Sequence, residues 1–298
     1  MDAITIRTKI LEKVPEGLIQ AEHTTDGHFY RMHGKLLPSV TGKLKIIKDE
    51  SLMNWKMNRA LDYVFAHYKE FTDANVMEQL DKAKLVPVQE FEEAGSLGSQ
   101  VHEARYVYFR EWIKGSARPE STRLVDFSPS GSQDPRVVSA WRAFMKFLDD
   151  YHYEPVVCEM YVGSLLLGVG GTLDDIGYIS VPVRDGDPEC RHSMVGTHCV
   201  KCYFKLKRTL VLMDLKTSNS YKNHYHLQVA LYFYMFTSLT GIRPKEVFIL
   251  KLSKDDGTYS MEYLTNLPAL IRYGKTAVEL DNGLEAIQQS RKKKVITI

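Results

Sequence analysis

The sequence predicts a mixed α/β fold in which a central mixed β-sheet is flanked by helices and preceded by a helical N-terminal part. Apolar residues recur at helical spacing in much of the first half of the chain. Apolar stretches typical of strands dominate residues 155–216, and a helix and another strand follow them. This succession is typical of a sheet that contains a helical crossover.

The N-terminal region begins with short apolar alternations. Two pairs typical of turns, Asp26-Gly27 and His33-Gly34, lie among them, so residues 4–37 are predicted to form a β-hairpin or meander. The pattern changes at Ser51, a suitable N-cap for a helix that contains Leu52 and Trp55.

Two further helices are expected before residue 116. The first covers about residues 75–85 and ends before Pro87. The second begins after Gly95 and Gly98, carries His102 near its start, and ends near Gly115. Residues 116–133 are rich in Ser, Pro and Gly and predict a loop.

The remaining elements form the expected sheet and its covering helices. Asp134-Pro135 is a typical N-cap and first-turn pair for a helix that runs to about Asp150. Strands are predicted at 155–162, 165–168, 172–179, 210–216, 247–252 and 261–263, and helices around 228–235 and 267–290. We expect residues 1–150 and 151–298 to form one integrated domain, with the second part holding the sheet.

Composition limits the class of protein. The chain has 298 residues, of which 44% are hydrophobic, enough to bury a full core. No stretch approaches the ~20 apolar residues of a membrane span, and the first residues do not resemble a secretion signal. We therefore expect no membrane association and a cytoplasmic location in a bacterial or phage-infected cell. The net charge of +2 is uninformative about nucleic acid.

The most informative segment is Asp214-Leu215-Lys216-Thr217, which ends an apolar run. Alternate side chains of a strand share a face, so Asp214 and Lys216 are expected to point the same way. Asp174 ends a similar apolar stretch after Gly171. Two carboxylates, a lysine and His102, which lies further back on another predicted helix, suit a divalent cation and a phosphodiester.

The order of these motifs resembles the PD-(D/E)xK nuclease superfamily, and within it the RecB-type exonuclease branch. The shared features are a G-x-H-like helix, then G-x-x-D, D-x-K-T and Q-x-x-x-Y, over about residues 95–235. Residues 38–41 and the helix with Trp55 are also similar to the opening of related phage and mitochondrial nucleases. The resemblance implies a restriction-endonuclease-like core.

The resemblance also implies roles for individual residues. The expected ligands of Mg²⁺ or Mn²⁺ from the resemblance are His102, Asp174 and Asp214. The preference of magnesium for oxygen ligands adds the Leu215 backbone carbonyl. Lys216 would be the catalytic lysine, and Gln228 and Tyr232 would form a substrate-binding motif on one helix face.

Two acidic positions each allow an alternative assignment. Asp175 is an alternative to Asp174, although the G-x-x-D register and strand alternation favour Asp174. Glu159 on the preceding strand is either a further catalytic acidic ligand or an ordinary surface carboxylate.

The resulting expectation is a divalent-metal-dependent DNA exonuclease of DNA repair, recombination or phage DNA metabolism. Its partner would be single- or double-stranded DNA with a free end, with a possible protein partner in recombination or replication. Two alternatives are a site-specific or structure-specific endonuclease of the same superfamily and a non-catalytic DNA-binding or zinc-stabilised interaction protein on this fold.

A Cys/His-rich insertion at about 184–203 offers a second metal site. Its possible ligands for one structural Zn²⁺ are Cys190, His192, His198, Cys199 and Cys202. The alternative is a set of reduced, unliganded thiols. Some relatives hold an iron–sulfur cluster with cysteines on both sides of the core, but this chain has no cysteine before Cys158.

Overall fold

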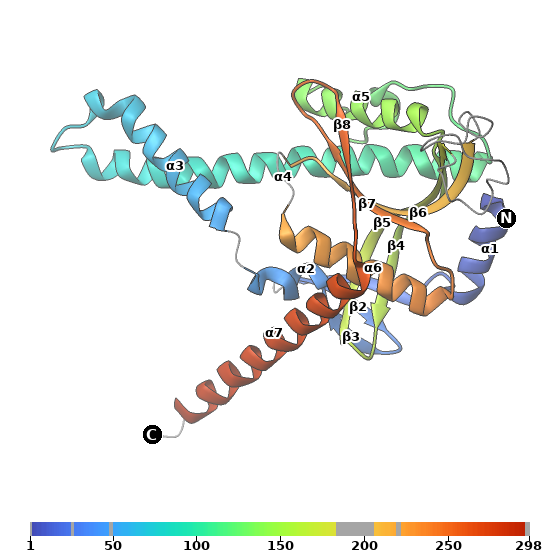
Figure 1. Ribbon diagram of the computed structural model, residues 1–298. Helices are drawn as coiled ribbons and strands as arrows, with labels where there is room; N and C mark the ends of the chain where they lie inside the picture. Colours follow the sequence, from blue (N-terminus) through green and yellow to red (C-terminus); the bar gives the residue numbers. More distant parts are fainter. Residues whose placement is uncertain (1, 25–26, 48–49, 183–205, 219–221, 296–298) are drawn as a thin grey trace, which may run out of the picture.

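A five-stranded mixed sheet forms the centre of the molecule (Figure 1). The computed structural model describes residues 2–24, 27–47, 50–182, 206–218 and 222–295. The strands, in their spatial order, are β4 (Glu154–Ser164), β5 (Val169–Pro182), β6 (Leu206–Lys216), β7 (Glu246–Leu252) and β8 (Tyr259–Tyr263). β6 and β7 are parallel, the other neighbours are antiparallel, and α6 (Asn223–Thr240) makes the crossover. The predicted mixed α/β fold is confirmed.

Helices cover both faces of this sheet. α6, α1 (Ala3–Lys13), α2 (Val40–Lys43) and α7 (Leu267–Val295) pack on one face. α4 (Val76–Gly115) and α5 (Pro135–Asp150) pack on the other. The alternation of β6 explains the two cores, because Val211 and Met213 join the α4/α5 core whereas Leu212 joins the α6 core.

The N-terminus differs in part from the prediction. Residues 3–13 form α1 rather than a strand, because Ile6 and Ile10 lie one turn apart and are both buried. Asp2 caps this helix by accepting a hydrogen bond from the Thr5 N–H. The expected meander follows as β1 (Ile19–Thr24), β2 (Gly27–Met32) and β3 (Lys35–Pro38), which form a separate antiparallel sheet.

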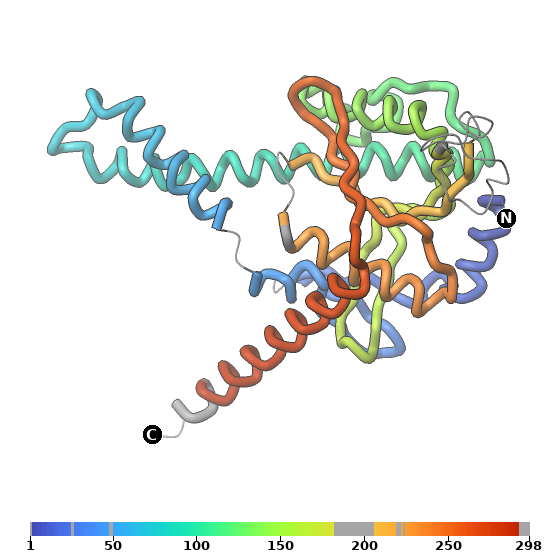
Figure 2. Tube along the Cα trace, viewed as in Figure 1, coloured from blue at the N-terminus to red at the C-terminus, as the bar shows by residue number. Residues whose placement is uncertain are grey.

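A long helical arm is the second departure. α3 (Glu50–His67) lies beside the N-terminal half of α4, and the two project away from the sheet (Figure 2). α4 is one helix of 40 residues that continues through Pro87, Gly95 and Gly98, where the sequence suggested two shorter helices. Packing of α3 against the N-terminal half of α4, with an Arg59–Glu90 hydrogen bond, supports the helix around Pro87. Ser51 lies inside α3 instead of capping it.

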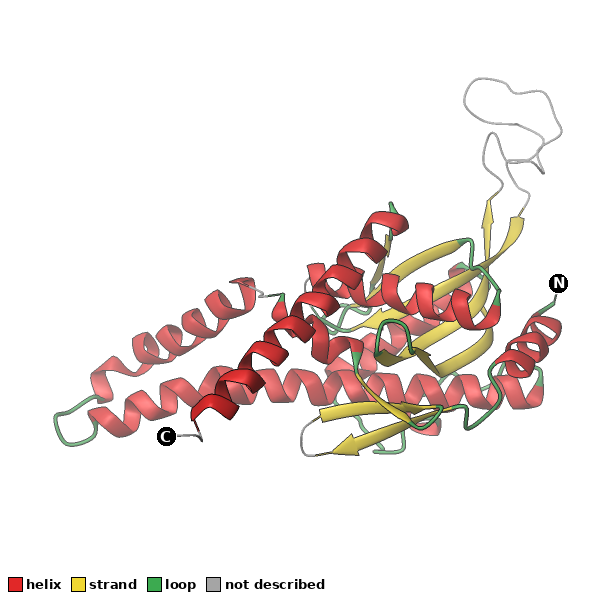
Figure 3. Cartoon of the chain, turned by 90° about the horizontal axis from the view of Figure 1, so that it is seen from below, coloured by secondary structure: helices red, strands yellow, loops and turns green. Residues whose placement is uncertain are grey.

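The other predicted elements agree closely with the structure. Asp134 caps α5 by accepting from the Arg136 N–H. Residues 165–168 form the turn between β4 and β5 rather than a strand, with Gly168 at a φ of 66°. Figure 3 shows α7 crossing the molecule on the α6 side of the sheet.

Short 3₁₀ segments complete the described chain at Leu44–Ile46, Tyr68–Glu70 and Leu124–Asp126. Within the described ranges, none of the helices combines the length and apolar character needed to cross a bilayer.

Candidate metal centre and adjoining pocket

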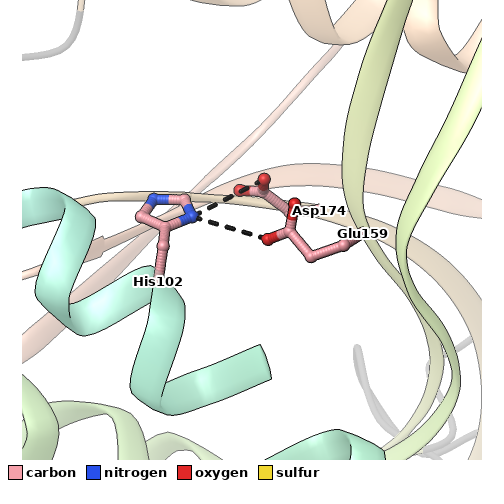
Figure 4. A group of neighbouring side chains, drawn as sticks. All are labelled: His102, Glu159 and Asp174. Carbon is pink, nitrogen blue, oxygen red and sulfur yellow. Dashed lines mark ion pairs between the residues drawn. The ribbon is translucent and has the colours of Figure 1, made fainter. Parts of the chain in front are cut away.

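Three ligand-type side chains from three elements meet at one end of the sheet (Figure 4). α4 contributes His102, β4 contributes Glu159 and β5 contributes Asp174. One ligand atom from each lies within 4.8 Å of the other two. His102 Nδ1 is 3.7 Å from Asp174 Oδ1 and 3.9 Å from Glu159 Oε1. This arrangement could hold a divalent metal ion.

A hydrogen bond to the backbone of β6 fixes the orientation of the His102 imidazole. His102 Nε2 lies 3.1 Å from the Leu215 carbonyl oxygen, which can only accept a hydrogen bond. Nε2–H donates to this carbonyl, so Nδ1 is the ring nitrogen that faces the two carboxylates. A histidine that donates to a backbone carbonyl through one nitrogen and presents the other is typical of metal sites. The Leu215 carbonyl, expected as a metal ligand, instead orients His102.

Asp174 is held by the same residue of β6. Its Oδ2 accepts a 2.7 Å hydrogen bond from the Leu215 N–H, which leaves Oδ1 facing His102. Burial raises the pKa of Asp174, but His102, Arg105 and Lys216 together with this hydrogen bond produce a net lowering. The carboxyl group is therefore ionised at neutral pH. Between the two candidates at this position, Asp174 faces the cluster.

Asp214 and Lys216 form an ion pair next to the cluster, with 2.5 Å between Lys216 Nζ and Asp214 Oδ2. Both lie on the same strand face, as the alternation predicts. Burial raises the pKa of Asp214 to about 6, with Asp174 adding to the shift and Lys216 opposing it. The Asp214 side chain is 2% exposed, whereas that of Lys216 is 18% exposed. The described metal-ligand cluster thus contains Glu159, and Asp214 is instead paired with Lys216.

Arg105 lies beneath the cluster and has no solvent exposure. Its guanidinium contacts the Asp175 and Glu159 carboxylates and donates to the Asp174 carbonyl at 3.2 Å. The sequence interpretation assigned it no role. One sequence feature could have indicated a buried role for Arg105. It lies three residues after His102, on a helix face that is otherwise apolar at Val101, Ala104 and Tyr108.

The backbone of Glu159 adopts an unusual conformation for a strand residue. Its φ is 48°, in the left-handed region that non-glycine residues rarely occupy. Such conformations cost on the order of 1–3 kcal/mol and cluster at functional sites. The contact with buried Arg105 shows that Glu159 is more than an ordinary surface carboxylate.

Gln228 and Tyr232 adjoin each other on α6, with 2.9 Å between Gln228 Nε2 and the Tyr232 hydroxyl oxygen. Tyr232 is only 3% exposed and its ring covers Gly171, where a Cβ atom would come within 2.3 Å of Cε1. Gln228 also donates to the Thr41 hydroxyl at 3.3 Å. The pair therefore braces α6 against β5 and the start of α2, and Tyr232 lies in the core.

A pocket of about 820 Å³ opens beside His102 and Lys216. It lies between the arm, the end of β6 and the start of α6, and the sequence interpretation did not foresee it. Its walls include Trp55, Phe91 and Tyr225. Gly98 lets α4 approach the end of β6 here, because a Cβ atom at this position would come within 3.0 Å of Thr217 Oγ1.

The proposed zinc ligands Cys190, His192, His198, Cys199 and Cys202 lie outside the described residues.

Comparisons with known proteins add little to this geometry. No family model and no curated protein matches the sequence. Among solved structures, the crystal structure of SSO0001 is similar to part of the chain, with 11% sequence identity over 60% of this chain and 74% of that one and a TM-score of 0.23. A similarity at this level carries no argument about function.

Proposed function

We propose that this protein is a divalent-metal-dependent deoxyribonuclease that hydrolyses phosphodiester bonds from a free DNA end. The observation that carries the proposal is the orientation of His102. Its Nδ1 faces Glu159 and Asp174 while Nε2 is held by the Leu215 carbonyl. The ion pair of Lys216 and Asp214 adjoins this group. The motif order that resembles RecB-type exonucleases points to the same chemistry.

The residues present fit Mg²⁺ or Mn²⁺. Two carboxylates provide the hard oxygen ligands that both ions prefer, and the imidazole makes Mn²⁺ especially suitable. His102, Glu159 and Asp174 would hold the ion, with Asp214 beside them as a further carboxylate. When bound, the ion would supply charge stabilisation at the phosphate and lower the pKa of a water molecule.

The protein's own residues would orient the reacting groups. Lys216 is the most exposed cation of the buried group and reaches the pocket, so it can contact a phosphate oxygen or orient the attacking water. Arg105 is sealed below the cluster and holds the carboxylates in place. Gln228 and Tyr232 would position β5, and through it Asp174, rather than contact DNA.

The test is a time course on end-labelled linear DNA and on covalently closed circular DNA, with Mg²⁺ or Mn²⁺. We expect progressive degradation of linear DNA only, and loss of about 10² or more in rate for Lys216→Ala. Asp174→Asn should abolish cleavage, whereas the matched change Glu103→Gln, an exposed carboxylate next to His102 on α4, should not.

Equal cleavage of closed circles would favour an endonuclease with the same site. Absence of metal-dependent cleavage on every DNA substrate would favour a non-catalytic DNA-binding protein on this fold.

A further inference from the structure

We propose that the pocket beside the metal cluster binds unpaired DNA bases, so that the protein engages a single-stranded end. The inference rests on the proposed nuclease function and specifies its substrate. The pocket volume of about 820 Å³ falls within the range of about 300–1,000 Å³ typical of small-ligand sites. Because His102 and Lys216 line it, its occupant would adjoin the phosphodiester at the cluster.

Aromatic side chains from three separate elements face this volume. Trp55 comes from α3, Phe91 from α4 and Tyr225 from α6. Phe91 is 46% exposed, which is unusual for a phenylalanine that only supports a core. Flat aromatic surfaces bind bases by stacking, and this recognition tolerates any base sequence.

Cations lie among these rings. Lys216 Nζ is 5.1 Å from the Tyr225 ring centroid, and Lys56 Nζ is 5.2 Å from that of Phe91. Lys254 also lines the pocket. Aromatic rings interleaved with cations match a nucleic acid strand, whose bases alternate with phosphates along the chain.

The wall formed by α4 leaves space for a ligand. It presents small residues at Ala94, Gly95, Gly98 and Ser99. Close packing against Thr217 explains the glycine at position 98. At Gly95, by contrast, a Cβ atom would meet nothing within 4 Å. A helical glycine costs about 1 kcal/mol relative to alanine, so Gly95 weakens α4 without any packing gain. The space beside Gly95 is therefore free for a ligand.

These features favour unpaired DNA over a duplex. Within a duplex, both faces of every internal base are covered by neighbouring base pairs, so pocket aromatics can stack only on the outer face of the terminal pair. An unpaired base exposes its faces at little cost. The pocket would therefore select a single-stranded terminus and place its backbone at the cluster.

The experiment uses Gly95→Leu in the full chain, with Gly283→Leu as the matched control. Gly283 is also a helical glycine whose added Cβ would meet nothing within 4 Å, but it lies in α7. Leucine favours helix over glycine, so neither variant should melt at a lower temperature than the original protein. Fluorescence anisotropy would measure binding of a phosphorothioate-linked single strand of about eight nucleotides, within the size range of single-strand sites.

We expect Gly95→Leu to weaken binding of the single strand about tenfold or more, and Gly283→Leu to leave it unchanged. An abasic strand of equal length should bind about tenfold more weakly than the normal strand, within the 5- to 150-fold expected for one stacked base. A blunt duplex should bind more weakly and show no effect of Gly95→Leu.

Equal binding of normal and abasic strands, or unchanged binding by folded Gly95→Leu, would overturn the inference. Metal-dependent cleavage with either result would leave the nuclease proposal standing. Base-dependent binding without cleavage on any DNA would retain the pocket and reject the nuclease.

Discussion

Replacement of buried Arg105 by methionine should destabilise the protein strongly. Methionine has a similar length and keeps much of the packing, but it leaves Asp175 without its cationic partner in a site with no solvent exposure. Removal of one partner of a buried ion pair costs about 3–5 kcal/mol. This is a large fraction of the roughly 5–15 kcal/mol that stabilises a typical domain.

The expected change in melting temperature follows from the size of the chain. An unfolding entropy of about 2.1 cal/mol/K per residue, applied to 298 residues, converts 3–5 kcal/mol into about 5–8 °C. Differential scanning calorimetry in the absence of divalent metal would measure this shift. The control is Arg110→Met, an exposed arginine on the same helix, for which a change within about 0.5 kcal/mol is expected.

A double-mutant cycle with Asp175→Asn isolates the ion pair. Neutralising Asp175 in the Arg105→Met background should cost less than it does alone, with a coupling of about 0.5–3 kcal/mol. Additive effects, or a drop of less than about 2 °C for Arg105→Met, would show that the guanidinium is not paired in the way its contacts indicate.

The remaining predictions concern metal binding and packing. Glu159→Gln should weaken Mn²⁺ binding about tenfold or more in calorimetric titration, with unchanged affinity arguing that Glu159 only pairs with Arg105. Because burial raises the pKa of Asp214 to about 6 and metal binding favours its ionised form, Mn²⁺ affinity should increase as the pH rises through 6. At pH 5, where Asp214 is mostly protonated, the affinity should be about tenfold lower, and Asp214→Asn should remove this pH dependence. Gly171→Ala should lower stability by about 1–3 kcal/mol because its Cβ would come within 2.3 Å of Tyr232, and an equal loss in a Tyr232→Leu background would refute that cause.

Local sequence patterns predicted the sheet and its covering helices because, in these segments, the local preference and the tertiary packing favour the same structure. The apolar run before Asp214 is a strand whose faces enter two cores, and Asp134 with Pro135 begins a helix in the expected way. The N-terminal helix was missed because Ile4 and Ile6 alternate like strand residues, while Ile6 and Ile10 also fit one helix face. Both patterns are present, and packing selects the second.

The long helix α4 could not be predicted from its own residues. Pro87, Gly95 and Gly98 are each unfavourable within helices, and they indicate a break when considered locally. α3 supports the arm from the side, and the approach to Thr217 gives Gly98 a tertiary role. Both causes lie outside α4, one in the helix that precedes it and the other just after β6.

Part of the candidate site could be predicted from the sequence, because it depends only on local strand alternation. Strand alternation separated Asp174 from Asp175, because one faces His102 and the other faces Arg105. Glu159 remained undecided because its neighbours depend on how β4 pairs with β5 and on a left-handed backbone conformation. Its role required the three-dimensional arrangement.

The two cations of this site have different physical tasks. Arg105 is fully buried and contacts the carboxylates from below, so it offsets their mutual repulsion and favours the folded chain. Lys216 also lies close to carboxylates of the site, but it lines the pocket and is partly exposed to solvent. A cation that no substrate can reach acts through stability, whereas one that lines the pocket can act on a phosphate. Loss of Arg105 should therefore appear first as a lower melting temperature, and loss of Lys216 first as a lower rate.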